Sequence, residues 1–435
     1  MCRINALGKS LGAGMALATL AAVLITCFPS QANNSSGFNG YNAPSTPVGQ
    51  AIGVAIDSSN NIDISGWTGA TNGTTTYGAP DYWQNTTLYP MAMGHGSYFS
   101  VNWGAVDSSK NFYVAGTVGS SSTTSVPVYW ENGAMTSLNM GGSYSYGVAY
   151  SVAVYGGNLY NVGAIGTSSN NLVPCYWVGG TQYLLAFNSQ TYSSGWAVSV
   201  AFDSNGYAYF AGAVASSTGS STPAYWVMTS ETTNSAGQVG QSYPLTMNTV
   251  GGVINTYGSA GNIGVYGSTS PQTIYISGLE GTSSSTNVPC YWKGSTSGVT
   301  NAPTDLSLGG NASFDLNWAA LDGSGDFYLV GGVGSSNGMN PCYWEILASG
   351  SSNLNPTILP AGTNSGGEAY GIAFDYSTPA NVYIAGAVGQ PLPCYWKNYV
   401  LNMLTTGNAQ DLQAAKRAGG KPNNPWWKHF GYPWF

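Results

Sequence analysis

The phrase Pro-x-Tyr-Trp occurs seven times in this chain, and no other feature limits the possible folds as strongly. Successive copies are 47, 47, 49, 66, 52 and 52 residues apart, beginning at Pro80, Pro127, Pro174, Pro223, Pro289, Pro341 and Pro393. Self-similarity at such a period is typical of repeat architectures, in which each repeat forms one supersecondary unit. We therefore expect seven similar structural units in place of two or three unrelated domains.

Each unit contains four short segments with strand character, which the seventh unit shows most plainly at residues 369–374, 381–385, 393–396 and 399–404. The second segment is a β-branched and aromatic run that ends in glycine, and an Asp-rich or Gly-rich turn precedes it. Such runs between turn residues are the signature of strands. Four antiparallel strands in about 50 residues match one propeller blade, and seven copies fall within the ~4–8 blades that close a ring.

The sequence therefore predicts an all-β fold, a seven-bladed β-propeller of four-stranded antiparallel blades at residues 50–407. We expect the ring to close without the exchange of a full strand between its ends. Residues 33–49 are polar and are interpreted as a leader or a closing strand. The fifth unit starts late because residues 227–262 add a Ser/Thr/Gly-rich stretch.

The N-terminus has the pattern of a signal peptide at residues 1–32. Arg3 and Lys9 form a basic region, residues 11–28 are almost wholly apolar or small, and Ala32 completes a small-residue cleavage motif. We therefore expect an exported protein, whether secreted, periplasmic or at the cell surface. A lipoprotein with a lipidated Cys27 and an uncleaved anchor are the alternatives.

The C-terminus differs from the repeats. Residues 408–418 predict a short helix, which an aromatic tail with Trp426, Trp427 and Trp434 follows. Residues 408–435 carry a net charge of +3, whereas residues 33–407 carry −12. We interpret this tail either as a segment that folds back onto the propeller or as one that docks on an envelope surface.

Charge and residue supply exclude several functions. Residues 33–407 hold three Lys and no Arg, too few to neutralise a nucleic-acid backbone. The same shortage excludes a sialidase-like grip on a carboxylate. The match to Gly-x-Ser-x-Gly at Gly334 lies in a Ser/Gly loop and not in a strand–turn–helix elbow, so we treat it as chance.

No metal site or cofactor is expected. Four cysteines occupy one equivalent position in different units, so they should lie about a sheet spacing of ~10 Å or more apart, beyond the reach of a disulfide: Cys175, Cys290, Cys342 and Cys394. We predict that all four are buried free thiols. The turn from Asp322 to Asp326 has alternating oxygen ligands, but Val333 stands at the position of the Glu in a calcium-binding loop.

The order of Asp turn, strand ending in Ala-Gly or Ser-Gly, Ser-rich loop, Pro-x-Tyr-Trp and Asn-Gly resembles that of uncharacterised bacterial exported β-propeller repeat proteins. Glu131-Asn132-Gly133 and Lys397-Asn398 follow the motif in this manner. The resemblance covers about residues 46–404. It implies the propeller fold and a binding or surface role, with no catalytic residues to carry over.

The loops that lead into each unit supply the candidate ligand residues. Nearly every one carries an aromatic residue, and the loops before the third segments are rich in Ser and Thr. The candidates are Tyr98, Tyr146, Trp196, Tyr257, Phe314 and Tyr370, with His95 at the rim. Rings that stack and hydroxyls that orient suit neutral glycans or extended peptides. Packing of these rings beneath the loops is the alternative.

The sequence thus indicates an exported, non-catalytic binding or surface-interaction propeller, with a glycan or a protein as its partner and no nucleic acid. Envelope association would go through the C-terminal tail or a lipidated Cys27. Two alternatives stay open. One is a carbohydrate-active enzyme with paired carboxylates at one mouth of the ring, and the other is a structural envelope protein.

Overall fold

The computed structural model describes residues 46–71, 76–94, 96–229, 237–250, 253–283, 285–335, 338–350, 353–389, 391–406 and 421–422. The expected signal peptide, the helix at 408–418, the three tryptophans of the tail and His95 lie outside these residues. In the described part of the chain, no helix has the length and apolar character needed to cross a membrane.

Seven antiparallel sheets of four strands form the propeller blades. Blade 1 contains β1 (Thr46–Ile56), β2 (Ile62–Thr71), β3 (Thr76–Gln84) and β4 (Thr87–Pro90). Blade 2 contains β5 (Tyr98–Val106), β6 (Phe112–Ser121), β7 (Thr124–Glu131) and β8 (Ala134–Ser137). Blade 3 contains β9 (Tyr146–Tyr155), β10 (Asn158–Ser168), β11 (Asn171–Val178) and β12 (Thr181–Leu185). Blade 4 contains β13 (Ser194–Phe202), β14 (Ala208–Ala215), β15 (Ser221–Met228) and β17 (Gln241–Pro244).

The remaining three blades follow the same order. Blade 5 contains β20 (Tyr257–Tyr266), β21 (Thr273–Gly281), β22 (Asn287–Ser295) and β23 (Thr304–Asp305). Blade 6 contains β24 (Ser313–Leu321), β25 (Phe327–Ser335), β26 (Gly338–Ile346) and β27 (Asn353–Ile358). Blade 7 contains β28 (Gly367–Phe374), β29 (Val382–Val388), β30 (Leu392–Lys397) and β31 (Val400–Met403). The predicted fold is confirmed.

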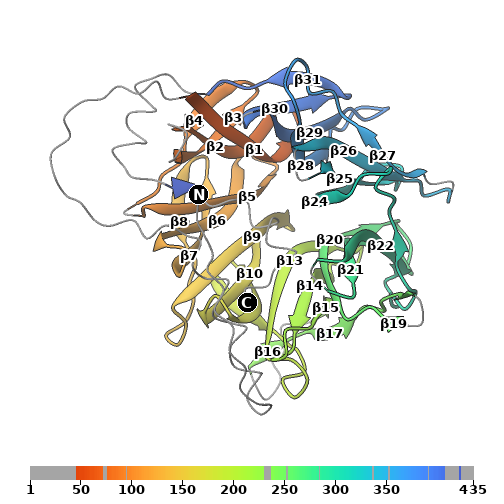
Figure 1. The fold of residues 1–435 in the computed structure, drawn as a ribbon. Coiled ribbons are helices and arrows are strands. Elements are labelled where there is room, and N and C mark those ends of the chain that lie inside the picture. The colour runs from red at the N-terminus through yellow and green to blue at the C-terminus, as the bar shows by residue number, and fades with distance from the viewer. Residues whose placement is uncertain are drawn as a thin grey trace, which may run out of the picture. The chain divides into compact units, whose positions relative to one another are not determined.

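Each blade comes from one continuous stretch of chain, and its first strand is the innermost (Figure 1). Among the described residues, no strand is exchanged between the ends of the ring, as the sequence predicts. The first strand begins at Thr46, so residues 46–49 belong to blade 1.

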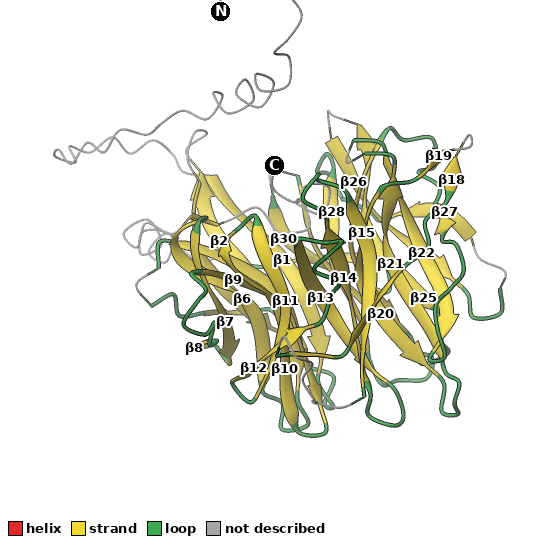
Figure 2. Cartoon of the chain, turned by 90° about the horizontal axis from the view of Figure 1, so that it is seen from below, coloured by secondary structure: helices red, strands yellow, loops and turns green. Residues whose placement is uncertain are grey.

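Figure 2 shows the strands running between two layers of loops. The loop face, as we call it, carries the connections between blades and the loops between second and third strands. The turn face carries the turns between first and second strands and between third and fourth strands.

Four short strands stand outside this plan. The extra stretch before blade 5 places β16 (Gln238–Val239) parallel to β12 on the outer edge of blade 3, and forms a small hairpin of β18 (Thr249–Val250) and β19 (Val253–Ile254). Near the C-terminus, β32 (Lys421–Pro422) pairs in parallel with the start of β5. This pairing brings that part of the tail back to the propeller.

The tryptophan of each Pro-x-Tyr-Trp copy joins its blade to the connection that enters it. The seven side chains are fully buried, and each indole N–H donates to a main-chain oxygen 2.6 to 3.0 Å away. The acceptors are the oxygens of Thr405, Ala92, Asn139, Ala186, Thr246, Ser307 and Pro360. The bond from Trp83 to Thr405 closes the ring between blades 1 and 7.

The glycine that the sequence predicts at the end of each second strand lies within that strand, because the strand continues past it. In blades 1, 2, 5 and 7 this glycine makes room for the tryptophan ring. A Cβ atom at Gly116 would lie 2.5 Å from the Trp130 ring, and one at Gly386 would lie 2.6 Å from the Trp396 ring. The proline of the motif packs across the interface, because a Cβ atom at Gly195 of blade 4 would lie 3.3 Å from Pro174 of blade 3. The cysteines occupy the motif's second position, and all four are buried and free.

A matched pair of substitutions tests whether the ring is closed. Trp83→Phe and Trp226→Phe each remove one indole donor, at the closing interface and at an internal one. Because each leaves a carbonyl oxygen without its donor, each should lower the free energy of unfolding by about 1–3 kcal/mol. Denaturant titration measures both. If the ends of the ring are not joined in solution, Trp83→Phe should leave the free energy of unfolding nearly unchanged, while Trp226→Phe should still lower it.

Candidate functional site

Two tryptophans from blades that are not neighbours stack on each other inside the ring. Trp103 of blade 2 and Trp318 of blade 6 have ring centroids 4.0 Å apart and planes 15° apart. Trp103 also lies against blade 7, where a Cβ atom at Gly371 would be 2.8 Å from its ring. The stack therefore occupies the position where a ligand in the channel would lie.

Every first strand has a β-bulge near this level. Bulges re-aim side chains, and here several polar ones reach the next blade. Asn102 Nδ2 donates to the Ala149 oxygen at 2.7 Å, and Asn317 Nδ2 donates to the Ala369 oxygen at 2.8 Å. The channel wall is thus held together by buried amides.

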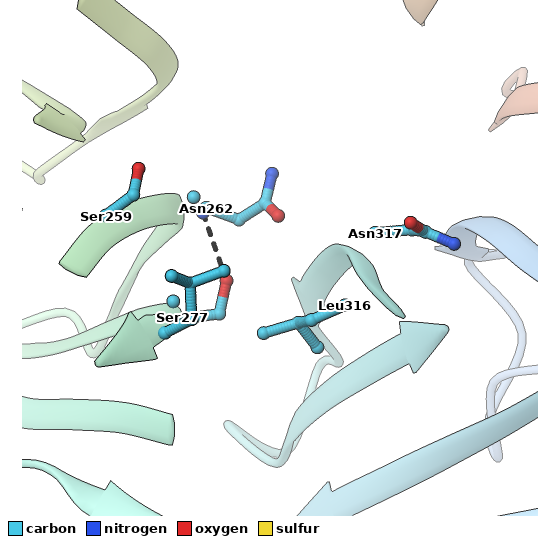
Figure 3. A pocket seen from close by; sticks show the side chains of 8 residues that line it. Ser259, Asn262, Ser277, Leu316 and Asn317 are labelled. Carbon is cyan, nitrogen blue, oxygen red and sulfur yellow. Dashed lines mark hydrogen bonds between the residues drawn. The ribbon is translucent and has the colours of Figure 1, made fainter. Parts of the chain in front are cut away.

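A small cavity lies in this wall between blades 5 and 6, beside Ser259, Asn262, Ser277, Leu316 and Asn317 (Figure 3). Its volume of about 10 Å³ holds about one water molecule and no sugar ring. Asn262 Nδ2 and Asn317 Oδ1 have no hydrogen-bond partner among the described residues, so both atoms suit that water. The cavity belongs to the packing of the ring.

The structure buries most of the candidate aromatics, and none of them lines the cavity between blades 5 and 6. Four are buried, with exposed fractions of 4 to 8%: Tyr146, Trp196, Tyr257 and Tyr370. Tyr98 and Phe314 are half-buried, and His95 lies outside the described residues. Burial raises the pKa of the Tyr98 hydroxyl well above its ordinary range, with a smaller contribution from Tyr146.

Tyr370 shows what holds such a ring in place. Its hydroxyl accepts a hydrogen bond from Gln50 Nε2 of blade 1 at 2.8 Å, and Gln50 Oε1 accepts one from the Trp67 indole. Burial, followed by the neighbouring Glu368 carboxylate, raises the pKa of Tyr370 well above its ordinary value. These groups form an inter-blade contact, and little of the ring is open to a ligand.

Hydroxyl groups are what the loop face presents to solvent. Residues just before the first strands of blades 2 to 5 hydrogen-bond a carbonyl of the adjoining loop through their hydroxyls: Ser97, Ser145, Ser193 and Thr256. Within the loops, hydroxyls pair at 2.7 to 3.1 Å, as in Ser120–Thr124, Ser216–Thr218 and Ser283–Ser285.

Charge separates the two faces. No Asp, Glu, Lys or Arg occurs in the loop-face segments 91–97, 118–124, 138–145, 166–171, 185–193, 215–221, 245–256, 281–287, 306–312, 334–338, 359–366 and 388–392. The turn face carries Asp57, Asp107, Asp203, Asp322 and Asp375 in its turns. These loop segments are therefore polar without being ionic, although the exposed Asp305 lies beside one of them at the end of β23.

Hydrogen bonds hold the acidic turns together. Asp107 Oδ1 accepts from the Asn111 N–H at 2.8 Å and Oδ2 from Asn111 Nδ2 at 2.9 Å; Asn132 Nδ2 then donates to Asn111 Oδ1 at 3.0 Å. Blades 1 and 7 repeat this arrangement. Asp322 likewise accepts from the N–H of Ser324 and Asp326. The described residues contain no metal-binding group of three or more His, Cys, Asp or Glu.

The pair of carboxyls with the clearest contact is Glu280 and Asp305 of blade 5, whose side chains hydrogen-bond each other. Glycoside hydrolysis requires two carboxyls separated by at least about 5 Å. Direct contact leaves no room for a glycosidic bond between them. This pair therefore does not provide the geometry that the enzyme alternative needs.

Sequence reasoning missed the stacked tryptophans. Asn-Trp occurs at the bulge of two first strands, as Asn102-Trp103 and Asn317-Trp318, and this shared pair was the available signal. The repeat period places both pairs at the same level of the ring. It does not show that the rings of blades 2 and 6 meet.

No protein family model matches the chain, and no curated protein matches it. Among solved structures, a puromycin-hydrolyzing peptidase from Mycobacterium tuberculosis is 9% identical to this chain, with a TM-score of 0.48. The match covers 84% of this chain and 53% of the peptidase, so this chain spans about half the length of the peptidase. The β-propeller domain of the Trilobed protease from Pyrococcus furiosus is 6% identical, with a TM-score of 0.43 and coverages of 83% and 99%. Aleuria aurantia lectin, in complex with α-methyl-L-fucoside, is 11% identical, with a TM-score of 0.39 and coverages of 73% and 97%. Likeness at this level carries no argument about ligand or reaction.

Removal of the central stack should destabilise the ring. Trp103→Ala deletes the ring that packs on Trp318 and Gly371, so we expect a loss of about 3 kcal/mol in the free energy of unfolding. Trp103→Phe should lose less, because an aromatic ring remains. Chemical denaturation measures both, and equal stability of Trp103→Ala and wild type would show that the stack does not form.

The Asp turns predict a loss of stability in acid. Partial burial alone would raise the pKa of Asp107, but hydrogen bonds from Asn111 and Tyr113 outweigh it and hold the pKa below its ordinary value. The stabilisation is therefore present above the ordinary pKa of about 3.8 and is lost as pH falls below it. Asp107→Asn should flatten the decline in melting temperature between about pH 4 and 2. An identical decline in both proteins would contradict this role.

Proposed function

We propose that this chain is an exported, non-catalytic binding module whose loop face recognises neutral polar ligands such as glycans or extended peptides. The observation that carries the proposal is the composition of that face. Its loops lack charged residues and display paired hydroxyls, whereas the turn face carries the acidic turns. A surface of hydroxyls and main-chain groups matches the hydrogen-bonding groups of a neutral ligand without the cost of burying an ion.

The interior of the ring supports the use of the rim. The Trp103–Trp318 stack lies inside the ring, and the cavity between blades 5 and 6 holds about one water molecule. The ligand site is therefore shallow and spread over several loops. Tyr98 and Phe314 are the candidate aromatics that are only half-buried. Tyr98 follows Ser97, whose hydroxyl donates to the Ser120 oxygen, and the Ser120 hydroxyl pairs with that of Thr124.

Export is part of the proposal and rests on the pattern of residues 1–32, with Cys27 as the alternative lipid-bearing residue. Contact with the cell envelope would go through the basic aromatic C-terminal tail. Residues 1–32 and all of the tail except residues 421–422 lie outside the described residues.

A glycan and peptide array with the mature protein tests the proposal, followed by mapping with charged substitutions. Thr123→Lys and Ser285→Lys place a cation on exposed loop-face positions, and Ser109→Lys places the same cation on an exposed turn-face position. The first two should weaken binding about tenfold or more, and the control should leave it unchanged. Unaltered melting temperatures would exclude unfolding. Binding that only Ser109→Lys weakens would move the site to the turn face.

A further inference from the structure

One of seven equivalent positions in the ring carries a buried acid. In blade 5, Glu280 stands two residues after Gly278, which is the glycine that every second strand shares. The equivalent residues of the other blades are Thr68, Val118, Ile165, Val214, Val333 and Val388. The Glu280 side chain is 0% exposed. Burial of a carboxyl is costly unless it is neutral or well hydrogen-bonded, so this single departure from the repeat requires a reason.

Blade 5 is also the blade with the unusual incoming connection. Residues 245–256 link blades 4 and 5 and include the hairpin of β18 and β19. The Asn248 N–H donates to Glu280 Oε2 at 2.7 Å, and Asn248 Nδ2 donates to Asp305 Oδ1 at 3.2 Å. The Asn255 side chain also hydrogen-bonds Glu280, and the Asn255 N–H donates to the Asn248 oxygen at 2.9 Å. Both ends of the hairpin are therefore held by Glu280.

Burial and contact with Asp305 favour the protonated form of Glu280. The Glu280 side chain hydrogen-bonds the Asp305 carboxyl, and two carboxyls can share a hydrogen bond only when one of them is protonated. Glu280 Oε1 is buried and receives no hydrogen bond from a donor among the described residues, so no donor would stabilise a negative charge on it. Burial, followed by Asp305, raises the pKa of Glu280. The Asp305 side chain is exposed.

We propose that Glu280 and Asp305 form a proton-dependent clamp that fastens the blade 4–blade 5 connection to the loop face. In the closed state, protonated Glu280 donates to the Asp305 carboxylate and accepts from the Asn248 N–H. Loss of the proton to solvent leaves two carboxylates in contact, which repel each other. The connection is then released while the ring remains folded.

Nothing near the pair offsets a second negative charge. The other titratable group that faces it is Cys290 on β22, a buried thiol whose pKa is raised by burial, then by Glu280 and Asp305. The interactions that shift the Glu280 pKa include no Lys, Arg or His side chain among the described residues. Because the pKa is raised in the native state, the clamp is complete below the ordinary pKa of about 4.5 and is lost as pH rises through the native value.

Hydrogen exchange measured by mass spectrometry on the full chain tests the clamp, with rates normalised for intrinsic exchange between about pH 4 and 8. In the wild type, protection of residues 245–258 should fall as pH rises. Glu280→Gln keeps an acceptor for Asn248 and a donor for Asp305 but has no proton to lose, so its protection should stay high across the range. Glu345→Gln, in blade 6, removes a carboxylate elsewhere and should keep the wild-type profile.

A third variant guards against loss of folding. Glu280→Val installs the residue of four other blades, so the ring should melt cooperatively while residues 245–258 exchange fast at every pH. Protection that does not change with pH in the wild type, or an identical pH dependence in Glu280→Gln, would overturn the proposal. Neither result depends on a ligand, so failure of the clamp and failure of the proposed binding function are distinguishable.

Discussion

The ring depends on one hydrogen bond that recurs at every interface, from the buried indole of Pro-x-Tyr-Trp to the carbonyl of the incoming connection. A buried carbonyl without a donor is costly, and the tryptophan supplies the donor and fills the space between two sheets. The same bond joins Trp83 to Thr405 across the ends of the ring. Closure therefore needs no exchanged strand, since the seventh interface is made as the other six are.

This arrangement places the residues that recur in every repeat in the walls and leaves the two faces different. On the turn face, Asp and Asn side chains tie adjacent turns together, as Asp107, Asn111 and Asn132 do. On the loop face, uncharged loops expose hydroxyls. Trp103 and Trp318 stack inside the ring. The proposed function therefore uses the rim, and the proposed clamp at Glu280 is a single departure from the repeat at that rim.

The fold could be predicted because its signals are local and repeated seven times. Strand propensity, glycine at the strand end and the turn residues agree in every unit, and agreement across levels favours one fold. The site could not be predicted to the same depth. Strand alternation predicts that Tyr146 and Trp196 each lie on the same face of their strand as other apolar residues. It does not show that a neighbouring blade covers that face. The contact of Trp103 with Trp318 depends on how seven blades close, which no single repeat encodes.

Exchange of the indole N–H protons tests the central claim most directly. With ¹⁵N-labelled tryptophan and single Trp→Phe variants for assignment, the seven motif indoles should be strongly protected and should exchange at similar rates, in one cooperative opening. Trp83 should be as slow as Trp226. Rapid exchange at Trp83, with the other six protected, would show that the ends of the ring are not joined by this bond.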